Sequence, residues 1–255
     1  MKYLGIDIGS TNTKVAWEAD GVRNVFALRS RALAKDTLDS IDEILKQDYD
    51  FDRTKGTFVL ATGYGRVGVD YADKSITEIT CHAVGSKSLM NLEDATIIDI
   101  GGQDMKVIAL RDGMVEDFLM NDKCSAGTGK FVEVMAHRLE ISVEELFELA
   151  TTGEPIPLSS TCTVFAESEI VSCIGAGEPL ENIAAGIVRS IVGRVAAMAG
   201  RLRMKGDIVL TGGFSHSETF IKMLEEKLDQ PLRIHEWSPY AGAVGALELA
   251  KKYAD

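Results

Sequence analysis

Three stretches of the chain combine a strand-like apolar run with a glycine turn and polar side chains. They read Asp7-Ile-Gly9-Ser10-Thr11, Asp99-Ile-Gly101-Gly102-Gln103-Asp104 and Thr211-Gly212-Gly213. Glycine lets a turn approach an anion closely, and the free backbone N–H groups of such turns form anion-binding nests. The sequence therefore predicts three phosphate- or nucleotide-binding turns.

The first turn is followed by a run of side chains that donate hydrogen bonds. Three hydroxyl groups, one amide and one ammonium group come within five positions of Gly9. The candidate donors are Ser10, Thr11, Asn12, Thr13 and Lys14. Together with Gly9 we expect these residues to bind the phosphates of a nucleotide.

Carboxylates stand at the strand ends beside the first two turns. Asp7 precedes the first turn and Asp99 the second. Mg²⁺ prefers one or two carboxylates together with water and phosphate oxygens, so these positions suit a magnesium site. We expect Asp7 to bind Mg²⁺ and place Asp99, Gln103 and Asp104 with it as catalytic candidates.

Two cysteines stand just before predicted helices. Cys124 occurs in NDKCSAGTGKF (121–131), where Ser125 or Thr128 can cap the helix, and Cys162 occurs in SSTCTVFAESE (159–169). A helix N-terminus stabilises a thiolate through its dipole and its free N–H groups. A [4Fe–4S] cluster needs four thiolates, and a C2 homodimer would supply them by presenting each cysteine twice. Cys124 and Cys162 therefore suit metal ligation, for which a [4Fe–4S] cluster on a dimer axis is one candidate.

The loop around Cys124 also resembles a phosphate-binding turn. AGTGK (126–130) is too short for the GxxxxGK[ST] motif of P-loop proteins. Its glycines still free backbone N–H groups, so Gly127, Gly129 and Lys130 are predicted to face the nucleotide. One helix start would then lie beside both the nucleotide and the cluster.

An internal repeat positions these groups. Residues 4–21 and 96–113 both read as strand, Asp, Gly turn, return strand and Gly-containing turn. The helical periodicity between and after the copies predicts helices at 37–47, 76–90, 129–150, 163–174, 180–202 and 241–253. We expect an α/β fold with lobe I at 1–92 and 240–255 and lobe II at 93–239.

The charge and composition of the chain limit the classes of partner that it can bind. The 255-residue chain has 27 basic and 39 acidic residues and a net charge of −12, which argues against nucleic acid and anionic membranes. The N-terminal run MKYLGIDIGS leads directly into a strand-like segment with charges inside it, so a signal peptide is not expected. No run approaches the roughly 18 uncharged apolar residues needed to cross a membrane. A cytoplasmic location is expected.

The remaining cysteines are predicted to be structural. The four cysteines lie far apart and form no CxxC pair, so neither a disulfide framework nor a zinc knuckle is expected. Cys81 falls inside a predicted helix next to His82. Cys173 lies eleven residues beyond Cys162, and we expect it in the core.

The three turns, in this order, resemble the actin, hexokinase and Hsp70 ATPase superfamily. The likeness implies two similar lobes with ATP in the cleft between them. It implies that Ser10, Thr11 and Asn12 contact the β- and γ-phosphates, that Gly101 to Asp104 close over them, and that Asp7 and Asp99 organise Mg²⁺ and water. Gly212 and Gly213 would face the nucleoside.

A narrower resemblance rests on longer motifs. GIDIGSTNTK, ATGYGR (61–66), DIGGQD, NDKCSAGTGKF and SSTCTVFAESE are similar to the activators of 2-hydroxyacyl-CoA dehydratases, also called component A or archerases, of the BadF/BadG/BcrA/BcrD type. The likeness implies an oxygen-sensitive homodimer with one [4Fe–4S] cluster, bound by the residues at 124 and 162. It implies a ferredoxin or flavodoxin as electron donor and a dehydratase as transient acceptor.

The activity implied is ATP hydrolysis coupled to low-potential electron transfer. Two readings within the superfamily remain open. One is a small-molecule kinase with incidental cysteines, and the other is an ATPase subunit of a complex like benzoyl-CoA reductase. An ATP-switched scaffold or filament subunit, a non-enzymatic reading, has little support in a chain without extra insertions.

Overall fold

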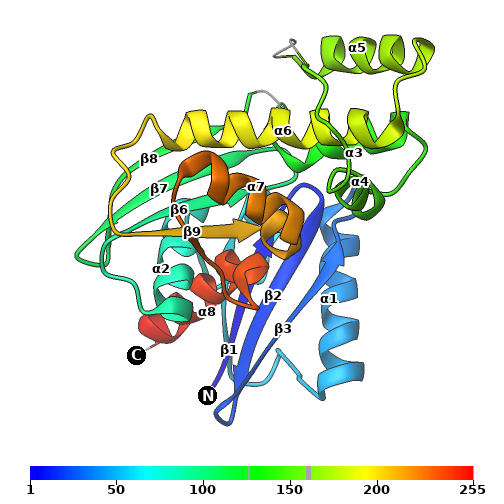
Figure 1. Cartoon of the computed structure of the whole chain (residues 1–255). Helices are drawn as coiled ribbons and strands as arrows, with labels where there is room; N and C mark the ends of the chain where they lie inside the picture. Colours follow the sequence, from blue (N-terminus) through cyan, green and yellow to red (C-terminus); the bar gives the residue numbers. More distant parts are fainter. Residues whose placement is uncertain (124, 126, 159–161, 255) are drawn as a thin grey trace. The chain divides into compact units, whose positions relative to one another are not determined.

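The computed structural model describes residues 1–123, 125, 127–158 and 162–254 as an α/β protein, which confirms the predicted class (Figure 1). The strands are β1 (Lys2–Ile8), β2 (Asn12–Ala19), β3 (Val22–Arg29), β4 (Thr57–Thr62), β5 (Lys74–Ser75), β6 (Ala95–Ile100), β7 (Met105–Arg111), β8 (Met114–Asn121), β9 (Asp207–Gly212) and β10 (Leu232–Arg233). The α-helices are α1 (Ala34–Tyr49), α2 (Glu78–Met90), α3 (Gly129–Arg138), α4 (Val143–Leu149), α5 (Thr163–Gly175), α6 (Leu180–Ala199), α7 (Glu218–Leu228) and α8 (Ala241–Ala254). The short 3₁₀ helices are η1 (Arg66–Gly68), η2 (Gly213–His216) and η3 (Ser238–Tyr240).

The strands form two five-stranded sheets of matching order. One runs β3-β2-β1-β4-β5 and the other β8-β7-β6-β9-β10. In each sheet the strand before the glycine turn is central and pairs in parallel with a later strand, β1 with β4 and β6 with β9. The repeat predicted at 4–21 and 96–113 is therefore confirmed as the first hairpin of each sheet.

The chain divides into two compact units. Unit 1 consists of Met1–Asp94, Leu110–Glu116 and His235–Asp255, and unit 2 of Ala95–Ala109 and Asp117–Ile234. Each unit is described by itself below.

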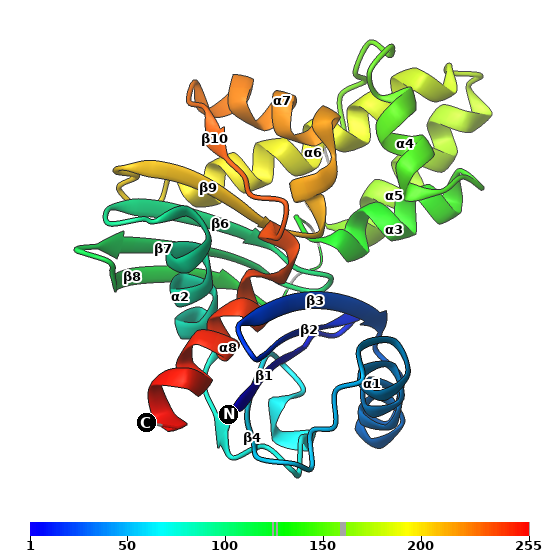
Figure 2. The same cartoon turned by 90° about the horizontal axis from the view of Figure 1, so that it is seen from below.

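In unit 1 the sheet has a helix on each face (Figure 2). Leu4 and Ile6 of β1 pack against Ile41 of α1 on one face. On the other face Val244 of α8 packs against Ala16 of β2. Alternate residues of a strand point to opposite faces, so Asp7, which is odd-numbered like Tyr3 and Gly5, lies on the side of α8.

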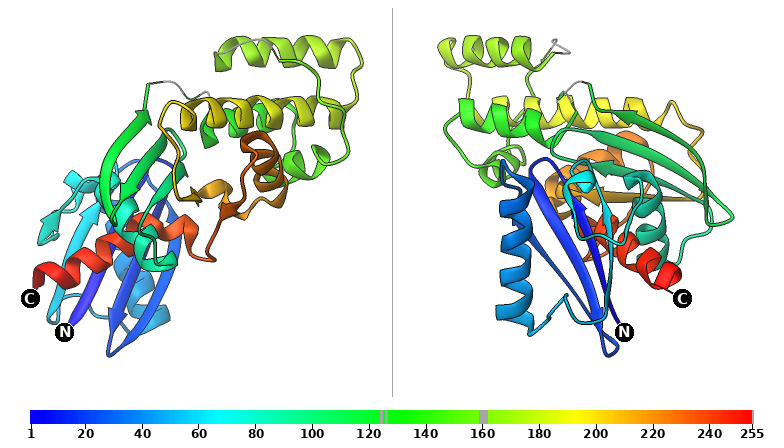
Figure 3. Two further views of the ribbon diagram at one scale, coloured as in Figure 1. Left: turned by 60° about the vertical axis from the view of Figure 1, so that its left-hand side comes forward. Right: turned by 180° about the vertical axis from the view of Figure 1, so that it is seen from behind.

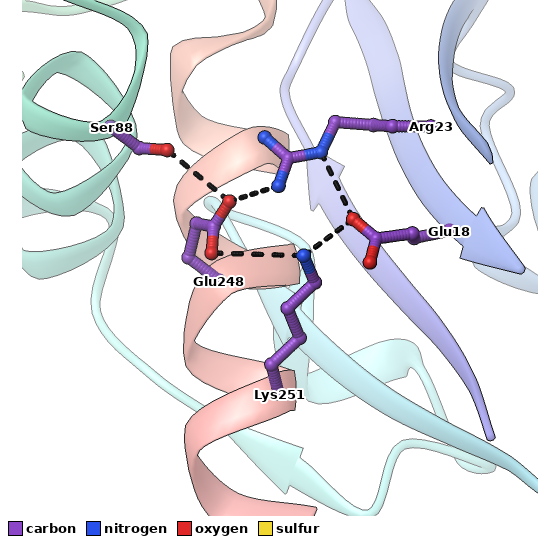
Figure 4. Close-up of polar contacts among 5 residues, drawn as sticks. All are labelled: Glu18, Arg23, Ser88, Glu248 and Lys251. Carbon is purple, nitrogen blue, oxygen red and sulfur yellow. Dashed lines mark hydrogen bonds and ion pairs between the residues drawn. The ribbon is translucent and has the colours of Figure 1, made fainter. Parts of the chain in front are cut away.

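A network of ion pairs fixes α8 to the edge of this sheet (Figure 4). Arg23 pairs with Glu18 at 3.2 Å and with Glu248, and Lys251 pairs with Glu18. Ser88 of α2 also donates to Glu248, at 3.2 Å. Burial raises the pKa of Glu18, but the hydrogen bonds and charges of Lys251 and Arg23 outweigh it and hold that pKa below its ordinary value. The carboxylate therefore stays ionised and keeps the C-terminal helix in place.

In unit 2 the largest apolar cluster lies between the sheet and α6, α7, α3 and α4. α6 is long and apolar enough to cross a membrane by length and composition alone. Sixty-one per cent of that apolar window is buried within the protein, as expected of a core helix. α5 lies alongside α6 and α3, at the outside of this unit (Figure 3).

The helix predicted at 129–150 is two helices. α3 ends at Arg138, and Glu140, two residues later, adopts a positive φ of 60°, which is incompatible with a continuous α-helix. Ser142 then starts α4 with a capping box, in which Glu145 N–H donates to the Ser142 hydroxyl at 3.0 Å and Ser142 N–H donates to the Glu145 carboxylate at 2.7 Å. The helix α7 had no counterpart among the predictions.

Candidate functional site

The first candidate turn is the β1–β2 hairpin of unit 1. Asp7 lies directly opposite Lys14 in this antiparallel pair, so both side chains leave the sheet on the same face. Asp7 is buried, whereas Ser10 and Asn12 are exposed at the turn. The hairpin thus exposes the hydrogen-bond donors Ser10 and Asn12 at its tip and buries the Asp7 carboxylate in the adjoining strand.

Thr13 stabilises the turn from inside. Its side chain is fully buried, and its hydroxyl lies 2.9 Å from the hydroxyl of Ser30. Ser30 donates in turn to the Gly9 carbonyl at 2.7 Å. Ser30 had no place among the sequence predictions, because nothing in the spacing links β3 to the turn.

The Asp7 carboxylate is enclosed by two glycines and a histidine. A Cβ atom on Gly63 would collide with Asp7 Oδ1, and one on Gly242 with Asp7 Oδ2. The same Cβ on Gly242 would lie 2.9 Å from His82 Nε2, which itself is 3.9 Å from Asp7 Oδ2. These glycines, at the end of β4 and the start of α8, therefore define where the carboxylate can lie.

With Asp7 as the predicted magnesium carboxylate, we expect Gly242→Ala to lower the rate of the predicted ATP hydrolysis by roughly tenfold to a hundredfold, because displacements near 1 Å at a reacting centre cost that much. The fold should survive, since overpacking of this size costs about 1–3 kcal/mol. Steady-state hydrolysis and thermal unfolding measure the two effects. Gly193→Ala is the matched control, because a Cβ there meets no atom within 4 Å among the described residues. A wild-type hydrolysis rate in Gly242→Ala would contradict the proposal that Gly242 confines the Asp7 carboxylate.

The second candidate turn, in unit 2, is built around a buried lysine. Lys106 Nζ lies 3.3 Å from Asp99 Oδ2 and 2.8 Å from Asp104 Oδ2. The other Asp99 oxygen accepts a hydrogen bond of 2.9 Å from the Thr211 hydroxyl. One ammonium group thus holds two of the predicted catalytic carboxylates, and Thr211 joins the third candidate turn to the second.

Lys106 was missed by the sequence predictions. It is 2 % exposed, and every other residue from Met105 to Leu110 is buried and apolar. A lone lysine inside such a strand, two positions after an aspartate, signals a buried charge with a partner. Gln103 is exposed at the tip of the hairpin, close to Gly101 and Gly102 in the sequence.

The third candidate turn follows β9. Gly212 has a φ of 84°, and any Cβ there would collide with the Ile100 carbonyl of β6. Gly213 is exposed and has open space around it. Only the second of these glycines presents accessible backbone.

The start of α3 is bonded to the second turn. Gly129 N–H donates to the Gly101 carbonyl at 2.9 Å, and Lys130 N–H donates to the Gly102 carbonyl at 2.7 Å. The Lys130 ammonium pairs with Glu133 at 3.3 Å. Gly127, with a φ of 100°, is buried just before this helix. The N–H groups of Gly129 and Lys130 therefore bond the second turn, five and six positions after Cys124 in the sequence.

Of the two predicted iron ligands, one lies within the described residues. Cys162 is a half-buried free thiol at the N-cap of α5, with an extended backbone. Cys124 lies outside the described residues. Its neighbour Ser125 has its hydroxyl 2.9 Å from that of Thr163, the residue after Cys162. Among the described residues no three His, Cys, Asp or Glu side chains form a metal-binding group.

The other cysteines differ from Cys162. Cys81 is fully buried, and this burial raises the pKa of its thiol to about 12. A buried thiol of this kind is inert. Cys173 packs at the edge of the unit 2 core, and burial followed by the charges of Glu178 and Glu169 raises the pKa of its thiol.

Sequence relatives match the chain over nearly its whole length. The chain is 42 % identical over 257 residues to the (R)-2-hydroxyglutaryl-CoA dehydratase activating ATPase of Acidaminococcus fermentans, covering 98 % of this chain and 97 % of that protein. It is 30 % identical over 256 residues to one of the benzoyl-CoA reductase subunits of Thauera aromatica, covering 95 % of this chain and 90 % of that protein.

Solved structures agree with the fold. The crystal structure of the A. fermentans dehydratase component A matches with a TM-score of 0.92 at 39 % identity, over all of both chains. The activator of 2-hydroxyisocaproyl-CoA dehydratase from Clostridium difficile, solved with bound ADPNP, matches with a TM-score of 0.89 at 34 % identity, over 100 % of this chain and 97 % of that one. A ROK-family glucokinase from Streptomyces griseus, at 14 % identity and a TM-score of 0.59, covers 99 % of this chain and 100 % of its own, and shares the fold alone.

The predicted actin/hexokinase/Hsp70-type fold is therefore confirmed. The model of the BadF/BadG/BcrA/BcrD ATPase family matches residues 4–250. With two phosphate-type hairpins and relatives of this identity, the chain belongs to the BadF/BadG/BcrA/BcrD ATPase family.

Proposed function

We propose that the protein activates a 2-hydroxyacyl-CoA dehydratase by passing it single electrons, with ATP hydrolysis as the driving reaction. One observation carries this proposal. The second phosphate-type turn is hydrogen-bonded to the helix start that follows Cys124, in a chain 42 % identical to a dehydratase-activating ATPase. The same two backbone hydrogen bonds would then connect the nucleotide-binding turn to the segment that contains Cys124.

ATP and Mg²⁺ are assigned to the three turns. Ser10, Thr11 and Asn12 are the proposed donors to the terminal phosphates, and Asp7 the proposed magnesium carboxylate. The exposure of the Ser10 and Asn12 side chains supports this role, as does the confinement of the Asp7 carboxylate by its two glycines. Asp99 is better suited to positioning than to binding metal directly, because Lys106 and Thr211 already occupy its oxygens.

We assign the four thiolates of a [4Fe–4S] cluster to Cys124 and Cys162 of two subunits, and Cys162 is the one of these two cysteines that lies within the described residues. Cys162 is a free thiol at the N-cap of α5, and the hydroxyls of Ser125 and Thr163, the residues that follow Cys124 and Cys162, lie 2.9 Å apart. Such a cluster would store one electron at low potential. With two cysteine ligands per chain, a homodimer would supply the four thiolates. Four large apolar side chains exposed on α5 support such an interface: Val164, Phe165, Val171 and Ile174.

α3 is the proposed coupling element. Its first two N–H groups bond the Gly101 and Gly102 carbonyls, and its last residue, Arg138, donates to Glu167 of α5 at 2.9 Å. A rearrangement of the turn upon nucleotide binding or hydrolysis would move α3 as a rigid body and, through it, the α5 start at Cys162. An electron from a ferredoxin or flavodoxin would leave for the dehydratase when this change occurs.

Anaerobic purification tests the proposal. We expect a coloured, air-sensitive dimer that contains iron, hydrolyses ATP and, once reduced, activates a 2-hydroxyacyl-CoA dehydratase in an ATP-dependent assay. A colourless, iron-free protein purified without oxygen, with both cysteines intact, would contradict it. ATP-dependent phosphorylation of a metabolite that persists in air would favour the kinase reading instead.

The 30 % identity to a benzoyl-CoA reductase component supports a second candidate, an ATPase subunit that pairs with unlike chains. The mass of the complex purified without oxygen distinguishes the activator from the reductase-like subunit. A dimer of this chain alone supports the activator, and a stable complex only with other proteins supports the reductase-like assembly.

A further inference from the structure

One segment of this acidic chain is basic. Residues 21–35 contain four basic and no acidic residues, within a chain of net charge −12. Arg23 belongs to the ion-pair network that fixes α8. In the described part of the chain no carboxylate pairs with Arg29, Arg31 or Lys35, and all three are exposed.

Three large apolar side chains accompany these charges. Val67 and Tyr64, in the ATGYGR segment and η1, are 87 % and 81 % exposed, the highest values for large apolar side chains in the described residues. Leu33, between Arg31 and Lys35, is 64 % exposed. Aromatic and arginine side chains together are enriched where protein interfaces gain most of their binding energy.

The loop that carries Tyr64 and Val67 is held by the backbone. Gly65 N–H donates to the Ile8 carbonyl at 2.9 Å, and Gly68 N–H donates to the Gly65 carbonyl at 2.9 Å. Arg66 Nη1 donates to the Gly63 carbonyl at 3.0 Å. The exposed side chains therefore project from an ordered loop, which lowers the entropy cost of binding.

This loop and the basic segment are neighbours within unit 1. A Cβ on Gly68 would lie 2.8 Å from the Ala34 side chain, which follows Leu33. Both segments also donate hydrogen bonds to consecutive carbonyls of the first phosphate-type turn. Gly65 N–H donates to the Ile8 carbonyl, and the Ser30 hydroxyl donates to the Gly9 carbonyl. An open hollow of about 340 Å³ between the basic segment and α1 is lined by Leu28, Arg29, Ser30, Arg31, Ser40 and Ile44.

We propose that Arg29, Arg31, Leu33, Lys35, Tyr64 and Val67, named here the Tyr64 surface, dock the dehydratase, whose contact face would carry carboxylates around an apolar centre. The inference rests on the proposed function. Charge complementarity requires an acidic partner, which the rest of this chain would repel. The contacts of both segments with the phosphate turn favour the ATP-coupled acceptor over the electron donor, because docking there would respond to the nucleotide.

The test uses the reduced, iron-containing protein and the (R)-2-hydroxyglutaryl-CoA dehydratase of A. fermentans as probe. Activation and direct binding are measured against the concentration of this protein, with and without ATP. We expect Tyr64→Ala/Val67→Ala to raise the half-saturating concentration roughly tenfold or more. Arg31→Glu/Lys35→Glu should raise it similarly at low salt, and added salt should weaken the wild type while narrowing this difference.

Lys46→Glu/Lys222→Glu is the control, with the same charge change on exposed lysines elsewhere, and should behave as wild type. Iron content and ATP hydrolysis without dehydratase should remain unchanged in all variants. Wild-type half-saturation in both Tyr64-surface variants overturns the docking proposal. So does a fall to the monomer mass in these variants, which would assign the surface to a second copy. An iron-free wild type would instead contradict the proposed function.

Discussion

Lys106→Met should lose about 3–5 kcal/mol of unfolding free energy, since removal of one partner leaves a buried charge without compensation. Asp99 and Asp104 would then face each other's negative charge, with the Thr211 hydroxyl still donating to Asp99. Because both carboxylates shift, we expect ATP hydrolysis to fall at least roughly tenfold. Denaturant unfolding and steady-state hydrolysis measure these effects.

A second variant separates positioning from folding. Lys106→Met/Asp99→Asn removes the ammonium group and the more deeply buried of its two carboxylates, while the amide oxygen still accepts from Thr211. We expect it to regain much of the unfolding free energy and little of the hydrolysis rate, with ADPNP affinity changed less than kcat. Wild-type stability and turnover in Lys106→Met would show that the ammonium group has no such role.

The hairpins could be predicted because their signals are local. An apolar run, an aspartate and a glycine turn fall within seven positions, and the same order recurs at 96–113. Alternation along β1 then fixes which residues face α1 and which face α8. The sheet order follows from this repeat, since both copies build the same arrangement.

Contacts between distant segments could not be predicted in this way. Ser30 reaches the Gly9 carbonyl from β3, and Thr211 reaches Asp99 from 112 positions along the chain. Gly242 confines Asp7 from the opposite end of the sequence. Such contacts depend on how strands and helices pack, which spacing within one segment does not encode.

The division between α3 and α4 was missed for a different reason. The apolar stripe continues through 129–150, so periodicity favours one helix. The capping box of Ser142 and Glu145 is visible in the sequence as S-x-x-E and marks a helix start inside that stripe. Local capping chemistry overrides continuous periodicity here.

Cys162→Ser should abolish the iron content of the anaerobic protein and its dehydratase activation, while ATP binding persists. A serine hydroxyl is a poor substitute for a thiolate ligand to iron. Cys162 lies in unit 2 at the N-cap of α5, whereas the predicted phosphate donors at 10–14 belong to unit 1. Iron analysis, the visible spectrum and ADPNP binding measure the three properties. Cys124→Ser should behave in the same way.

Cys173→Ser is the matched control on the same helix. Eleven residues of α-helix separate the positions by about 16 Å along the axis, which is too far for both thiols to bind one cluster. We therefore expect Cys173→Ser to keep iron and activation. Equal iron loss in both serine variants would point to a general destabilisation of α5, and retention in Cys162→Ser would remove this cysteine from the ligand set. Loss of iron without loss of ADPNP binding would show that cluster binding and nucleotide binding are separable.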